Sequence, residues 1–187
     1  MIPDPTLLVN PSHPVPEGFQ ETLELVNIAA DPEGSVLMEA EAARAFGELR
    51  LFLERLGLPA LPLSGFRTTE RQQLIWDQTM QDKGPDYTAR YVARPGYSEH
   101  QTGLALDVVL CDQQGLPVDD NDAPEYDVMF PHLHKFGFIL RYPRGREAVT
   151  GYAYEPWHIR YVGTAAAKAI HDNGWTLEEY KEKENRP

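Results

Sequence analysis

Hydrophobic residues recur at intervals of three or four positions along the segment 36–56. This spacing is that of one face of an α-helix, which has about 3.6 residues per turn. Gly57 and Pro59 follow directly, and both residue types interrupt helices. The pattern therefore predicts a helix over 36–56, with an apolar face made of Leu37, Ala40, Ala43, Phe46, Leu49, Leu53 and Leu56.

Beyond this helix, helix-like and strand-like patterns alternate along the chain. Thr68 or Thr69, followed by Glu70, is typical of a helix N-cap. A run of apolar and β-branched residues over 103–110 has the length and composition of a strand. The segment 83–97 mixes glycine, proline and basic residues, as surface loops do. The predicted helices are 69–81, 125–136 and 164–171, and the predicted strands are 103–110, 138–142 and 152–162.

The first 34 residues differ from the rest, because they hold six prolines and little compact apolar sequence. We predict that the segment 1–34 wraps the fold in short strands and turns and is not a domain of its own. A chain of 187 residues and 21.2 kDa is of the usual size for one domain. We therefore expect a single domain over 1–187.

Charge and cysteine content exclude several classes of function. The chain has 29 acidic and 17 basic residues and a formal net charge of −12, which disfavours binding to phosphate backbones. We expect no nucleic-acid partner. The single cysteine, Cys111, rules out an internal disulfide and a zinc site built from several thiolates. A metal ion would have to be bound by histidine, aspartate or glutamate.

Nothing in the sequence indicates contact with a membrane. No stretch approaches the roughly 18 uncharged apolar residues of a membrane-spanning helix, so we predict no membrane span. The first residues lack a basic start followed by a long apolar run. If Met1 is the native start, this favours a cytoplasmic protein.

Four residues have the side chains and the spacing of a catalytic metal site. Asp107 lies inside the apolar run 103–110, where an unpaired carboxylate is costly. Together with His100 and His158 it would supply the three nitrogen or oxygen ligands of catalytic zinc, with a fourth position left for water. Gly103 permits a bend between His100 and Asp107. Glu155, three residues before His158, would be placed to act as a general base.

Each of these residues also has a simpler interpretation. A lone histidine is more often a surface or core residue than a ligand. Asp107 would equally cap a turn or pair with an arginine, and Glu155 would be a solvated loop charge. The residues alone leave these alternatives open.

Two motifs give this constellation a family resemblance. Ser98-Glu-His-Gln-Thr-Gly-Leu-Ala-Leu-Asp107 matches S-x-H-x-x-G-x-A-x-D, and Glu155-Pro-Trp-His158 matches E-x-W-H. Together they resemble the signature of the VanY-like D-alanyl-D-alanine metallopeptidases, and the chain is most similar to the VanXY-type enzymes. The similarity covers about residues 60–180 and includes the segments 64–67, 136–143 and 175–180.

The resemblance implies roles for the four residues. His100, Asp107 and His158 would bind Zn²⁺, and Glu155 would be the catalytic base. It also implies an α+β fold, in which a small antiparallel sheet carries the zinc site and helices pack against it, and the coarse pattern agrees with this.

The resemblance implies four further residues at the site. Arg67 would approach the scissile carbonyl and help to neutralise the oxyanion. Gln72, Ser98 and Trp157 would enclose the terminal D-alanine of the substrate. The simpler interpretations are a surface salt bridge for Arg67, a solvated helix face for Gln72, a local turn bond for Ser98 and wall packing for Trp157.

The expected reaction is zinc-dependent hydrolysis of the peptide bond before a C-terminal D-alanine. The substrates would be D-Ala-D-Ala and cell-wall precursor peptides that end in D-alanine, with a role in glycopeptide resistance or in wall recycling. One alternative is a wall-lytic endopeptidase of the same superfamily. Another is a non-catalytic zinc-binding interaction domain, which would have little reason to keep both Glu155 and Arg67.

Overall fold

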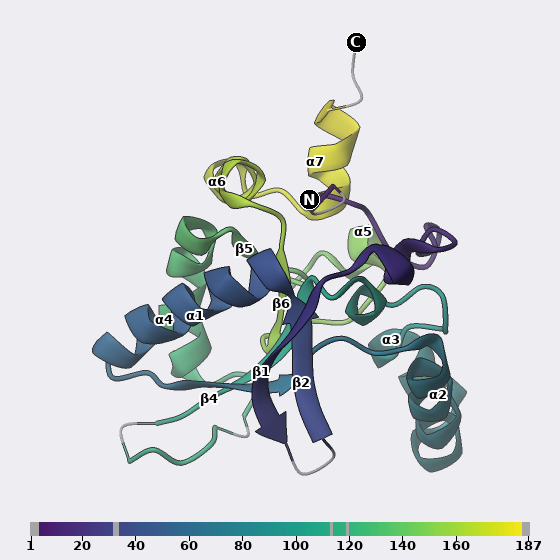
Figure 1. Ribbon diagram of the computed structural model, residues 1–187, viewed down its shortest axis with the longest axis horizontal. Helices are drawn as coiled ribbons and strands as arrows, with labels where there is room; N and C mark the ends of the chain where they lie inside the picture. The colour runs from purple at the N-terminus through teal and green to yellow at the C-terminus, as the bar shows by residue number, and fades with distance from the viewer. Residues whose placement is uncertain (1–3, 32–33, 113, 119, 185–187) are drawn as a thin grey trace.

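The computed structural model describes residues 4–31, 34–112, 114–118 and 120–184 (Figure 1). Asp119 lies outside these ranges, and so do Met1 and other parts of the predicted wrapping segment 1–34. The strands are β1 (Leu25–Asp31), β2 (Gly34–Glu39), β3 (Ala60–Ser64), β4 (Ala105–Leu110), β5 (Phe138–Leu140) and β6 (His158–Tyr161). The α-helices are α1 (Ala40–Arg55), α2 (Thr69–Lys83), α3 (Pro85–Tyr91), α4 (Pro124–Leu133), α5 (Glu147–Thr150), α6 (Thr164–Asn173) and α7 (Leu177–Glu184). Short 3₁₀ helices are η1 (Phe19–Thr22), η2 (Glu99–Thr102) and η3 (His134–Phe136).

The strands form two small antiparallel sheets. One is the β1–β2 hairpin, and the other has four strands in the order β3-β4-β6-β5. The predicted α+β class is confirmed, although the strands are divided between two sheets where one was expected. None of the helices within the described ranges is long and apolar enough to cross a bilayer.

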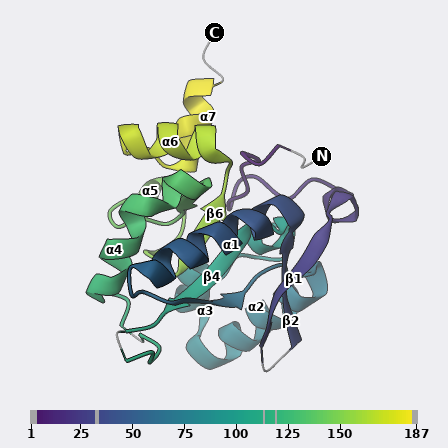
Figure 2. The same ribbon diagram turned by 60° about the vertical axis from the view of Figure 1, so that its left-hand side comes forward.

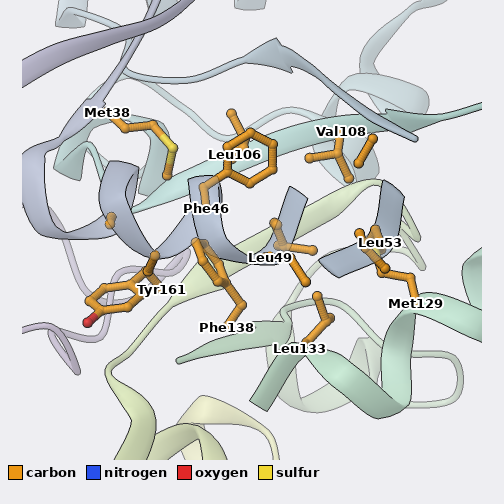
Figure 3. Packing of buried hydrophobic residues seen from close by; sticks show 14 of the residues in the cluster. Met38, Phe46, Leu49, Leu53, Leu106, Val108, Met129, Leu133, Phe138 and Tyr161 are labelled. Atoms are coloured by element: carbon orange, nitrogen blue, oxygen red, sulfur yellow. The ribbon is translucent and has the colours of Figure 1, made fainter. Parts of the chain in front are cut away.

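Helix α1 covers one face of the four-stranded sheet and forms the core with it (Figures 2 and 3). Phe46, Leu49 and Leu53 of α1 are at most 2% exposed and belong to the same cluster as Leu106 and Val108 of β4. Burial of each such side chain contributes roughly 1.5–3 kcal/mol. Because side chains alternate along a strand, the residue between them, Asp107, faces the other side of the sheet. Figure 2 shows α2 and α3 on that other side.

The predicted helix over 36–56 is wrong in its first four residues. These belong to β2, where Val36 and Met38 are buried and pair with Ala29 and Val26 of β1. Buried residues alternate with a less buried one over 36–38, as in a strand, but this stretch is too short to stand out from the helical spacing that follows it. The helix begins only at Ala40, because the carboxylate of Glu39 accepts hydrogen bonds from its first turn.

Other boundaries follow from caps and glycines. The predicted cap at Thr68 is confirmed, since its hydroxyl accepts from the N–H of Arg71 at 3.2 Å. The predicted loop 83–97 instead contains α3, which starts at Pro85, a residue suited to the first turn of a helix. The predicted strand 152–162 is a strand only over His158–Tyr161, and helix α7 was not predicted.

Candidate active site

The pairing of β4 with β6 brings two of the predicted ligands together. Asp107 and His158 are directly opposite each other in the antiparallel register. His158 Nδ1 lies 3.0 Å from Asp107 Oδ1. The next residue, Ile159, is fully buried in the core, so His158 projects from the opposite face of β6, the face that carries Asp107.

His100 reaches the same point from helix η2. Gly103 ends this helix with φ +68°, a left-handed conformation that favours glycine, and β4 starts two residues later. His100 Nδ1 contacts the carbonyl oxygen of Gly65 at 2.8 Å, so its Nε2 faces Asp107 Oδ2 at 3.3 Å. One ligand atom from each of His100, Asp107 and His158 lies within 4.8 Å of the others.

This group suits a zinc ion. Two imidazoles and one carboxylate, all nearly buried, are a common protein ligand set for catalytic zinc. The bond from His100 Nδ1 to a backbone carbonyl is the contact that usually orients a metal-binding histidine. Burial lowers the pKa of His158, whereas the neighbouring carboxylates of Asp107 and Glu99 raise it, to about 9 on balance. A metal cation bound to His158 and Asp107 would also compensate the negative charge of these carboxylates.

Glu155 lies beside this group in the loop before β6. The N–H of His158 donates to the carbonyl of Glu155 at 3.1 Å, and this turn sets Glu155 Oε2 3.7 Å from His158 Nδ1. Glu155 is only 6% exposed, which excludes the interpretation as a solvated loop charge. Burial raises its pKa to about 8, against the opposing charges of His158 and Arg67. A bound divalent cation would lower this pKa.

Arg67 approaches the group from the end of β3. Its Nη2 is 3.0 Å from Asp107 Oδ2, and its Nε and Nη2 donate to Ser64 Oγ at 2.9 and 2.7 Å. Gly65 is needed here, because a Cβ atom would lie 2.2 Å from the carbonyl oxygen of Leu37. The side chains of Arg67 and Asp107 are only 18% and 11% exposed, so their contact is not a surface salt bridge.

All eight predicted residues line one cavity of about 340 Å³. Gln72 is 1% exposed, with its amide nitrogen bound to the carbonyl of Ala93 at 2.7 Å and its amide oxygen facing Arg67. The solvated-face interpretation of Gln72 is therefore excluded. Ser98 precedes η2, and its hydroxyl makes no cap bond to that helix. Trp157 lies at the junction of the cavity and the core.

Several residues around the site were not predicted from the sequence. Tyr142 and Tyr152 line the cavity, and burial raises the pKa of both phenols, so they are neutral. Glu99 was overlooked although it precedes His100 inside the first motif. The sequence held an indication of a buried acidic partner such as Glu99. Arg141 and Arg160 lie in predicted strands, where a buried positive charge requires a negative one.

Comparison with known proteins places the chain in a family. The family model of VanY, D-alanyl-D-alanine carboxypeptidase, matches residues 35–164. The chain belongs to this family. Among curated proteins, it is 37% identical over 181 residues to VanXYC of Enterococcus gallinarum, a bifunctional D-Ala-D-Ala dipeptidase and carboxypeptidase. The match covers 92% of this chain and 91% of that protein. The chain spans 56–66% of the length of three further relatives.

Solved structures of the VanY family agree with this placement. The vancomycin-resistance D,D-dipeptidase VanXYg, in complex with a D-Ala-D-Ala phosphinate analogue, superposes with a TM-score of 0.80 at 35% identity, over 95% of this chain and 70% of that one. A variant of the D,D-pentapeptidase VanY in complex with Zn(II) gives 0.81 at 33% identity, over 96% and 99%. As a member of this family, the chain is a peptidase.

Proposed function

We propose that this chain is a zinc-dependent D,D-peptidase that hydrolyses the peptide bond before a C-terminal D-alanine. The observation that carries the proposal is the convergence of the buried side chains of His100, Asp107 and His158 at one cavity, with Glu155 beside them. Its substrates would be D-Ala-D-Ala and precursor peptides that end in D-alanine. The complex of VanXYg with a D-Ala-D-Ala phosphinate analogue supports this substrate class.

His100, Asp107 and His158 would hold the zinc ion. When bound, zinc polarises the scissile carbonyl and makes water more acidic. Glu155 would accept a proton from the attacking water and transfer it to the leaving amine nitrogen, so that water is added across the C–N bond. Glu155 is buried, and none of the arginines in the described part of the chain makes a hydrogen bond to its carboxylate, which leaves it able to exchange a proton.

Arg67 and the cavity wall would orient the substrate. The guanidinium of Arg67 is fixed by Ser64 and Asp107, and such a fixed cation stabilises negative charge that develops on the carbonyl oxygen. Ser98 would donate a hydrogen bond to the terminal carboxylate. Gln72 would hold Arg67 and Ala93 in place, and Trp157 would close the wall.

A release assay tests the proposal. Free D-alanine is measured from D-Ala-D-Ala and from a pentapeptide that ends in D-Ala-D-Ala, with and without a chelator, and L-Ala-L-Ala serves as the stereochemical control. We expect release that the chelator abolishes and that is far slower for L-Ala-L-Ala. Similar rates on D-Ala-D-Ala and L-Ala-L-Ala would contradict a D,D-peptidase.

Metal analysis completes the test. Purified protein should hold about one zinc ion per chain, and His100→Ala should lose it, because one of three ligands is removed. A wall-lytic endopeptidase would hold zinc but cleave an internal bond and release no D-alanine. A non-catalytic zinc-binding domain would hold zinc and cleave neither substrate.

The cellular role extends the same proposal. Removal of the terminal D-alanine would deprive glycopeptide antibiotics of their target, whereas wall recycling would use the same reaction. Vancomycin sensitivity of a host that expresses the chain, compared with one that expresses Glu155→Gln, separates the two roles. The cytoplasmic location and the single domain over 1–187 stay predictions.

A further inference from the structure

Four charged residues form a continuous set of buried ion pairs behind the cavity, which we call the buried clamp: Glu99, Arg141, Arg160 and Glu178. Arg141 and Arg160 are 0% exposed. Both donate to the same oxygen of Glu99, with Arg141 Nε at 2.7 Å and Arg160 Nη1 at 2.6 Å from Oε1. Arg141 also holds Glu178 of α7, with Nη2 at 2.7 Å from Oε1.

The clamp leaves the second oxygen of Glu99 without a partner. In the described part of the chain, three buried side-chain polar atoms make no hydrogen bond, and two of them are Glu99 Oε2 and His158 Nε2. These two atoms lie 3.5 Å apart and face each other. An unpaired buried polar atom is costly, so we expect a proton between Glu99 Oε2 and His158 Nε2.

We propose that Glu99 is a positioning residue, which keeps the proton of His158 on Nε2 and so directs the Nδ1 lone pair toward the ligand group. The proposal rests on the proposed function, in which His158 is a zinc ligand. Glu99 Oε2 is an acceptor only, so it favours the imidazole form that carries its proton on Nε2. His158 Nδ1 lies 3.0 Å from Asp107 Oδ1, and with the proton on Nε2 both atoms are acceptors, which suits them to bind the same cation.

The rest of the clamp explains why Glu99 keeps this orientation. Arg160 donates to the backbone carbonyls of Pro5 and Leu7 at 3.1 and 2.8 Å. The N-terminal segment and α7 lie side by side, as Figure 1 shows, and Lys181 of α7 donates to Thr6 Oγ1 at 3.0 Å. With Arg160 anchored in this way and Arg141 bonded to the same oxygen, Oε1 of Glu99 is held and Oε2 is left to His158.

The first experiment leaves the buried clamp intact. Zinc-loaded wild-type protein, labelled with ¹⁵N in its histidines, is studied by NMR. We expect one histidine with metal-shifted Nδ1 and a slowly exchanging proton on Nε2, and loss of this Nε2 signal in His158→Ala. Coordination of His158 through Nε2, or a rapidly exchanging Nε2 proton, would overturn the proposal.

The second experiment compares Glu99→Gln with Glu178→Gln, because both remove one negative charge from the same arginine. In Glu99→Gln the arginines hold the amide oxygen, and the NH₂ group then faces His158 Nε2. Two donors cannot share this contact, so the proton of His158 is driven toward Nδ1. Zinc affinity, measured by competition with a chromophoric chelator, should fall about 10- to 100-fold.

Glu178→Gln is the matched control, since within the described ranges Glu178 contacts Arg141 and Asn10 but not His158. Its zinc affinity should stay within about threefold of the wild type, even if thermal stability falls as much as in Glu99→Gln. Equal losses of zinc affinity in the two variants, or none in Glu99→Gln, would assign the clamp a purely structural role. Absence of zinc binding by the wild type would instead contradict the proposed function.

Discussion

Glu99 and Glu155 approach the same imidazole, that of His158, from different regions of the molecule, and their surroundings are opposite. Glu99 Oε2 lies 3.5 Å from Nε2, and Glu155 Oε2 lies 3.7 Å from Nδ1. Both carboxylates are buried, which by itself raises a carboxyl pKa. Arg141 and Arg160 nevertheless hold the pKa of Glu99 far below its ordinary value. No arginine within the described ranges makes an ion pair with Glu155, and burial raises its pKa to about 8.

The difference shows how one residue type serves two purposes. A carboxylate clamped by two arginines has a lowered pKa and stays charged near neutral pH, so it holds a neighbour without exchanging a proton. A buried carboxylate that faces a cavity without such a clamp can accept a proton and release it. Pairing with arginine, and not burial, separates the two glutamates.

The largest expected effect comes from Glu155→Gln. This change keeps the shape of the side chain and removes its ability to accept a proton. We expect D-alanine release to fall about 10²- to 10⁴-fold, while the zinc content stays near one per chain. Glu54→Gln, an exposed residue at the end of α1, is the control. Near-normal turnover in Glu155→Gln would mean that another group activates water, and the contrast with Glu99 would then fail.

The second prediction concerns the clamp itself. Arg141→Met removes one cation from a fully buried ion pair and leaves Glu99 and Glu178 short of a partner. The free energy of unfolding should fall by about 3–5 kcal/mol, the usual cost of breaking a buried pair. Urea unfolding followed by circular dichroism measures it.

An exposed pair provides the control for this measurement. Lys168 and Asp172 of α6 form an i,i+4 pair, with side chains 66% and 47% exposed. Lys168→Met should change the free energy of unfolding by no more than about 0.5 kcal/mol. If Arg141→Met lowers the free energy of unfolding as little as Lys168→Met does, the clamp does not stabilise the fold. Arg141 would then not be the feature that distinguishes Glu99 from Glu155.

The smallest expected effect concerns the leaving group that Glu155 would protonate. In D-Ala-D-lactate an ester oxygen replaces the scissile N–H. A site that hydrogen-bonds this N–H would leave its own acceptor unpaired, at a cost of about 1–3 kcal/mol. Values of kcat/KM on D-Ala-D-Ala and D-Ala-D-lactate should therefore differ in favour of the amide. Equal or faster cleavage of D-Ala-D-lactate would exclude a hydrogen bond to the scissile N–H.

Some parts of the fold could be predicted from local patterns, and others could not. The strand around Asp107 and the cap at Thr68 depend on neighbouring residues, and both are confirmed. The segment 36–39 was assigned to the wrong element because its pairing with β1 competes with a helical period that continues into α1. Helix α3 escaped prediction because Gly84 and Pro85 indicate a turn as strongly as a helix start.

From the sequence, local patterns predicted the strand around Asp107, and the resemblance of two motifs to a known family implied the α+β class and the eight residues that meet at the cavity. Only the tertiary structure decided which carboxylate is clamped and which is left unclamped. Glu99, Arg141, Arg160 and Glu178 are far apart along the chain and meet through the packing of β5, β6, η2 and α7. The pKa of a buried carboxylate depends on such neighbours in space, so local sequence does not reveal it.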